Sequence, residues 1–124
     1  MAEQYENGEI SQVKDISARD RAKRFENYEK VVGPVVLDPD HPENNRLAEV
    51  VRFTETVDEV LISNPKKSSD DSDVLNISVN HQDESTRKIL AGQAIAIPAR
   101  VSEILLWMDE GSSETKISVD GLIY

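Results

Sequence analysis

Two segments of the chain repeat one pattern of apolar and polar positions. Two of the three repeated blocks are 44 residues apart, and the third is 40 apart because the loop at 63–74 is longer than the loop at 107–114. Such a three-strand unit cannot bury its apolar faces alone, so the two copies are expected to pack into one β-sandwich. The blocks are 51–53, 56–62 and 75–80 in the first copy, and 95–97, 100–106 and 115–120 in the second.

The segment 47–62 fits a helical stripe as well as strands. β-Branched residues fill seven of the thirteen positions from 50 to 62, which favours strands. The second copy contains Pro98, which a helix interior does not tolerate, so strands are predicted in both copies. The predicted strands are 48–54, 57–63, 74–79, 86–90, 93–98, 101–108 and 115–119, with 122–124 as an extension of the last.

One helix is predicted, at residues 17–32. Ser17 suits its N-cap, Gly33-Pro34 follows its end, and Ala22, Phe25, Tyr28 and Val32 recur at helical spacing. This apolar stripe is expected to dock either on the sandwich of its own chain or on another chain. The opposite face is basic, although acidic residues are interspersed along it.

The expected architecture is mainly β, an antiparallel jelly-roll-like β-sandwich with an N-terminal arm and one short helix. Residues 1–40 are expected to hold the arm, the helix and a linker, and residues 41–124 the sandwich. The central strands at 60–62 and 104–106 are apolar on both faces, so their outer faces need a cover or a partner.

Charge and composition exclude several function classes. The net charge of −10 argues against binding nucleic acid through its phosphates, and the acidic β domain is expected to repel anionic membranes. The absence of cysteine excludes disulfides and thiolate metal sites. No signal-peptide pattern or membrane-span-length apolar run is present, so a soluble, non-secreted chain is expected.

Candidate chemistry is sparse, and no enzyme or cofactor is expected. His41 and His81 lack ligand spacing and are interpreted as loop residues. The acidic run at 70–73 resembles part of a calcium loop but lacks its glycine and distal glutamate. Glu59 and Glu103 occupy equivalent repeat positions, which explains them better than a catalytic carboxylate pair does.

The spacing around 57–65, 75–79, 90–98 and 101–104 resembles small β-sandwich virion proteins of tailed bacterial and archaeal viruses, including jelly-roll capsid cement (head-decoration) proteins. The resemblance covers about 47–120 and implies a structural role in gripping capsid subunits, without an enzymatic activity. Similar sandwiches also occur as connector, tail or baseplate components.

The function expected from this resemblance is that of a bacteriophage capsid cement or decoration subunit, assembled into the virion in the host cytoplasm. Its expected partners are the major capsid protein or other virion subunits, and further copies of itself in a homo-oligomer. The alternatives are a connector, tail or baseplate protein, and a carbohydrate-binding sandwich that uses Trp107 and loop carboxylates. The candidate partner-binding residues are Tyr5, Arg19, Arg21, Lys23, Arg24, Phe25, Tyr28 and Trp107.

Overall fold

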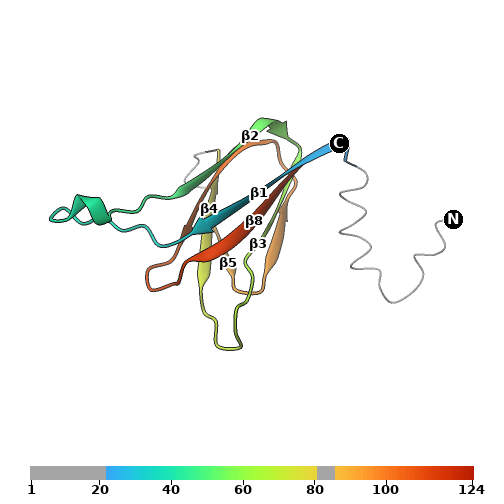
Figure 1. Ribbon diagram of the computed structural model, residues 1–124. Coiled ribbons are helices and arrows are strands. Elements are labelled where there is room, and N and C mark those ends of the chain that lie inside the picture. The colour runs from blue at the N-terminus through green and yellow to red at the C-terminus, as the bar shows by residue number, and fades with distance from the viewer. Residues whose placement is uncertain (1–21, 81–85) are drawn as a thin grey trace.

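The computed structural model describes residues 22–80 and 86–124, which form two packed four-stranded antiparallel sheets (Figure 1). The predicted antiparallel β-sandwich is therefore confirmed. The strands are β1 (Arg24–Val32), β2 (Glu49–Val57), β3 (Glu59–Ser63), β4 (Val74–Val79), β5 (Arg87–Leu90), β6 (Ala94–Ile97), β7 (Val101–Met108) and β8 (Thr115–Ile123).

The strand order is that of a jelly roll. Sheet A has the order β1-β8-β3-β6, and sheet B has the order β2-β7-β4-β5. Each strand of the first half pairs with one of the second half, β1 with β8, β2 with β7, β3 with β6 and β4 with β5. This nested pairing brings the start and the end of the described chain together, so the core closes only when distant segments meet.

The repeated pattern corresponds to a symmetry of this topology. The first copy supplies β2, β3 and β4, and the second supplies β6, β7 and β8. If four is added to each strand number, with β1 following β8 in the count, the order of sheet A becomes β5-β4-β7-β2. This is the order of sheet B read from its other edge. Val57 and Val101, which occupy matching positions in the two copies, are both fully buried, as are Val60 and Ile104.

The predicted helix is wrong where the structure describes it, because residues 24–32 form β1 and all nine pair with β8. The predicted positions 17–21 lie outside the described residues. Tyr28 and Val32 are four residues apart, a spacing that places them on one face of a helix or of a strand alike. Phe25 pairs beside Leu122 on the outer face of sheet A, whereas Tyr28 packs on the core.

Because β1 belongs to sheet A, the sandwich includes residues on both sides of the predicted division at residue 41. Between β1 and β2, residues 33–48 leave the sandwich and return, with the 3₁₀ helix η2 (Pro42–Asn44) near their far end. Figure 1 shows this segment, in teal and green, projecting well away from the two sheets. We call residues 33–48 the finger.

Candidate binding surfaces

The finger is anchored to the sandwich at its base. The backbone N–H of Met108, in β7, donates to the carbonyl oxygen of Gly33 at 3.0 Å. The guanidinium of Arg46 donates to the carboxylate of Glu114, in the β7–β8 loop, at 2.6 Å. The hydrogen bond from Arg46 lowers the pKa of Glu114, and its reciprocal effect raises the pKa of Arg46. Both ends of the finger are therefore held against the same end of the sandwich.

The finger is also ordered internally. Val36 and Arg46 exchange two backbone hydrogen bonds of 3.0 Å, which join its outgoing and returning halves. Near the tip, the backbone N–H of Asp38 donates to Oδ1 of Asn45 at 2.6 Å, and that of Asp40 donates to Oδ1 of Asp38 at 3.0 Å. The second bond, which spans two residues, is typical of an Asx turn, and the first joins the two halves of the finger near its tip. The projection thus has a defined shape.

The finger exposes a concentration of apolar side chains. Eight large apolar side chains are exposed in the described part of the chain, and four of them lie here, with Leu37 at 70% and Leu47 at 68%. Val35 and Val36 are the other two. Three acidic residues, Asp38, Asp40 and Glu43, lie between these apolar positions in the sequence. An ordered apolar projection of this kind is a feature of surfaces that bind a partner.

The residues predicted as N-terminal anchors are placed apart. Tyr5, Arg19 and Arg21 lie outside the described residues, and Lys23 is exposed just before β1. The other three are in β1 itself, where Arg24 forms an exposed ion pair with Glu55, in β2. Phe25 faces outward and is 52% exposed, whereas Tyr28 packs edge-on against Phe53 in the core. Phe25 and Tyr28 therefore do not share one binding stripe.

Tyr28 takes part in a link between the two sheets that the sequence pattern does not predict. Its hydroxyl donates to the carboxylate of Glu26 at 2.7 Å, and the same carboxylate accepts from the backbone N–H of Thr54, in β2, at 3.2 Å. Partial burial raises the pKa of Glu26, but the hydrogen bonds from Tyr28 and Thr54 outweigh it and the net pKa is lowered. Glu26 therefore joins the edge strands β1 and β2 through a charged group.

Trp107 lies on the outer face of sheet B. It is partly exposed and pairs beside Asn76, which in turn pairs beside Lys88. The amide of Asn76 donates to Oδ1 of Asp109 at 2.7 Å, and the ammonium of Lys88 donates to the same oxygen at 2.9 Å. These bonds lower the pKa of Asp109. An indole beside a fixed polar cluster is thus present on this face.

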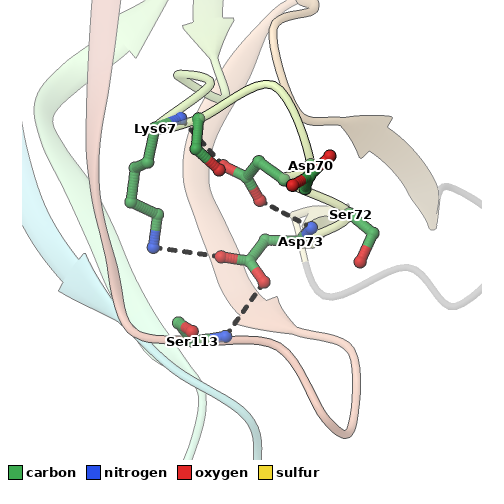
Figure 2. A pocket seen from close by; sticks show the side chains of 7 residues that line it. Lys67, Asp70, Ser72, Asp73 and Ser113 are labelled. Carbon is green, nitrogen blue, oxygen red and sulfur yellow. Dashed lines mark hydrogen bonds and ion pairs between the residues drawn. The ribbon is translucent and has the colours of Figure 1, made fainter.

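The acidic loop at 70–73 lines an open depression together with Lys67 and Ser113 (Figure 2). The carboxylate of Asp71 accepts from the backbone N–H groups of Lys67 and Asp73, both at 2.9 Å. The carboxylate of Asp73 pairs with Nζ of Lys67 at 3.0 Å and accepts from the N–H of Ser113 at 3.1 Å. Two of the three carboxylates are thus committed to protein donors that hold the loop in place.

The remaining candidates do not converge on one site. His41 is exposed at the finger, with Nδ1 3.4 Å from the carboxylate of Glu43, and His81 lies outside the described residues. Glu59, in sheet A, accepts a hydrogen bond from the hydroxyl of Tyr124, which follows β8. Glu103, in sheet B, pairs with Arg52. Within residues 22–80 and 86–124, no group of three or more potential ligands is arranged to hold a metal ion.

No helix in the described part of the chain is long and apolar enough to cross a membrane. Comparison of the chain with models of protein families, with curated proteins and with solved structures gives no match in any of the three.

Proposed function

We propose that this chain is a non-enzymatic virion structural protein, a capsid cement or decoration subunit that binds the major capsid subunits and stabilises the shell. The observation that carries the proposal is the finger, an ordered projection that holds half of the large exposed apolar side chains of the described residues. Two further features are compatible with this proposal. They are the hydrophobic spacing that resembles virion sandwiches and the jelly-roll order of the strands.

The finger suits the binding of a preformed surface. Complete burial of one leucine or valine side chain contributes roughly 1.5–3 kcal/mol, and the finger offers four such side chains. Its internal hydrogen bonds mean that less conformational entropy is lost on binding than for a flexible loop. A few such contacts per subunit are sufficient when many copies bind one shell and the shell presents many equivalent sites.

The charges of the finger indicate the kind of surface that it fits. Asp38, Asp40 and Glu43 give its far end a negative charge, and Arg46, the only arginine or lysine of the finger, is already paired with Glu114. We therefore expect the shell to offer an apolar cleft with basic residues at its rim, which would also steer the two partners together. The subunit is assembled onto the shell in the host cytoplasm in this proposal.

Purified particles of the source virus test the proposal directly. Quantitative mass spectrometry of these particles measures the number of copies of this chain relative to the major capsid subunit. A cement subunit is present in a fixed ratio close to that of the capsid subunits, whereas a connector, tail or baseplate protein is present in far fewer copies. Absence of the chain from intact particles would contradict every one of these virion roles.

Binding to empty shells tests the role of the finger. The double variant Leu37→Ser, Leu47→Ser removes its two most exposed apolar side chains, and Val31→Ser, 53% exposed on β1, is the matched control. We expect the double variant to lose shell occupancy in a co-sedimentation assay and the control to retain it. Equal occupancy of the two variants would overturn the role of the finger.

The proposed N-terminal anchors are tested by a separate truncation. Removal of residues 1–21 retains every strand of the sandwich, because β1 begins at Arg24. If Tyr5, Arg19 and Arg21 contact the shell, this truncation lowers occupancy while the finger is intact. Occupancy equal to that of the full chain would restrict the contact to the described sandwich and finger.

Carbohydrate binding is a second candidate, favoured by one observation. Trp107 lies beside the fixed polar cluster of Asn76, Lys88 and Asp109, and sugars commonly stack on an indole next to such groups. Because Trp107 is the only tryptophan, its fluorescence reports on this face without interference. Titration with a panel of glycans is expected to shift the emission if sugars bind here. Unchanged emission with every glycan would exclude this candidate.

A further inference from the structure

The four outer strands of the sandwich differ in how they are protected against pairing with other chains. An edge strand exposes unpaired backbone N–H and C=O groups, and charged side chains are a common way of blocking further pairing. Three of the four edges carry charges: Arg24, Glu26, Glu29 and Lys30 in β1, Glu49, Arg52 and Glu55 in β2, and Arg87 and Lys88 in β5. The edge strand β6, with the sequence Ala-Ile-Ala-Ile, carries none.

The lack of charge extends beyond β6 itself. The eleven residues 89–99, between Lys88 and Arg100, form the longest stretch of this chain without an aspartate, glutamate, lysine or arginine. In β6, Ala94 and Ala96 are exposed and Ile95 is only partly buried. Two copies of a chain with a net charge of −10 repel one another, and this stretch is where they can approach with the least repulsion.

The hydrogen bonds of β6 show which backbone groups face its free side. The N–H of Asn64 donates to the carbonyl oxygen of Gln93 at 2.9 Å, which continues the register of β3 and β6. Hydrogen-bonded and non-hydrogen-bonded residue pairs alternate along an antiparallel ladder. Ile95 and Ile97 therefore direct their N–H and C=O groups to β3. Ala94 and Ala96 direct theirs outward, and neither has a hydrogen bond to a described residue on that side.

We propose that β6 pairs in antiparallel fashion with β6 of a second copy, joining the two A sheets across a twofold axis at Ile95. In this register Ala94 of each copy faces Ala96 of the other and exchanges two backbone hydrogen bonds with it, which gives four bonds per dimer. Facing residues share one side of the sheet, so each partly buried Ile95 packs on its counterpart and Pro98 lies beyond the ladder. This proposal does not depend on a virion role, and each can fail without the other.

The oligomeric state of the full chain tests the proposal. Light scattering coupled to gel filtration is expected to give twice the 13.9 kDa mass of the chain. Ala96→Pro removes one outward N–H that β3 does not use, so the variant is expected to keep its sandwich and to elute as a monomer. The matched control, Ala96→Ser, keeps the N–H and is expected to remain dimeric. A monomeric parent chain, or a dimeric Ala96→Pro variant, would overturn the proposal.

Cysteine crosslinking tests the register and does not require the proline variant to fold. The chain has no cysteine, so each variant carries a single thiol. At the twofold axis the two Cα atoms of a non-hydrogen-bonded pair are about 4.5 Å apart, within the range of a disulfide. Ile95→Cys is expected to form a covalent dimer on mild oxidation, whereas Ala94→Cys and Ala96→Cys are expected to stay monomeric on a denaturing gel. Efficient crosslinking at residue 96 but not at 95 would overturn the register.

Discussion

The side-chain amide of Asn64 donates a hydrogen bond of 2.8 Å to the carbonyl oxygen of Ile89, and both residues are fully buried. The same amide donates to the carbonyl oxygen of Asp73 at 3.2 Å. Asn64 follows β3 in sheet A, whereas Asp73 and Ile89 belong to the β4–β5 side of sheet B. The side chain of Asn64 therefore joins the two sheets at one end of the sandwich, where it supplies a hydrogen-bond donor to the carbonyl groups of Asp73 and Ile89.

Replacement of Asn64 by alanine leaves the buried carbonyl group of Ile89 and the partly buried one of Asp73 without this donor, and we expect a loss of about 1–3 kcal/mol in the free energy of unfolding. Asn64→Asp is expected to cost more, because it places a carboxylate against the same two carbonyl oxygens. Urea denaturation followed by far-UV circular dichroism measures both. The substitution Ser63→Ala, at an exposed neighbouring position, is the control and is expected to change little. An Asn64→Ala variant as stable as the parent would contradict the assigned role.

Gly121 allows sheet A to approach a core aromatic ring. A Cβ atom at this position would lie 2.6 Å from Cε1 of Phe53 and 2.9 Å from Cγ1 of Val57. We therefore expect Gly121→Ala to lower the free energy of unfolding by about 1–3 kcal/mol through overpacking. The double variant Gly121→Ala, Phe53→Leu provides space for the methyl group, so it is expected to lose less stability than the sum of the two single changes. Strict additivity in denaturant titrations would show that Phe53 is not the obstacle.

Glu26 makes stability depend on pH in the acid range. Because the pKa of Glu26 is lower in the folded state than its ordinary value of 4.5, its contribution is fully present above that value and is lost as pH falls through the lower, folded-state pKa. Glu26→Gln removes this titration. We expect the parent chain to be more stable than the variant at pH 7, and the difference to narrow as pH falls below about 4.5. A constant difference across urea titrations at several pH values would argue against this link.

Asp73 holds the acidic loop against the β7–β8 loop. Its side chain is only 13% exposed and binds both Lys67 and the backbone N–H of Ser113. Asp73→Ala removes both contacts, so we expect a loss of about 1–3 kcal/mol in the free energy of unfolding. Asp73→Asn keeps an acceptor oxygen for Ser113 and is expected to lose less. Thermal unfolding at low and high salt helps to separate the two contributions, because salt weakens the ion pair more than the hydrogen bond from Ser113.

Seven of the eight strands follow from the sequence pattern alone. The predicted strand at 74–79 has the bounds of β4, and that at 101–108 has the bounds of β7. The sequence pattern predicts strands clearly between residues 48 and 119, because alternating apolar residues, β-branched side chains and Pro98 all favour strands there. The repeat also predicted that the two copies form one sandwich, and equivalent positions such as Val57 and Val101 share the core.

The sequence did not distinguish β1 from a helix, nor did it predict the finger. The spacing of Tyr28 and Val32 is common to both structures, and the choice depends on β8, where Arg24 pairs with Ile123 at the far end of the chain. A pairing between residues so far apart in the sequence does not affect the local spacing of apolar residues from which the helix was predicted. The finger likewise depends on distant contacts, because Gly33 and Arg46 are held by Met108 and Glu114. The candidate partner surface therefore became visible only with the tertiary structure.

The amino-acid sequence thus determined seven of the eight strands, the shared core and the absence of charge along residues 89–99, since these depend on side-chain type and local spacing. Only the tertiary structure decided which strands become edges, which apolar residues remain exposed and where the finger projects. The physical reason is that edges and exposed surfaces result from the closure of long loops, whereas periodicity reports only on near neighbours.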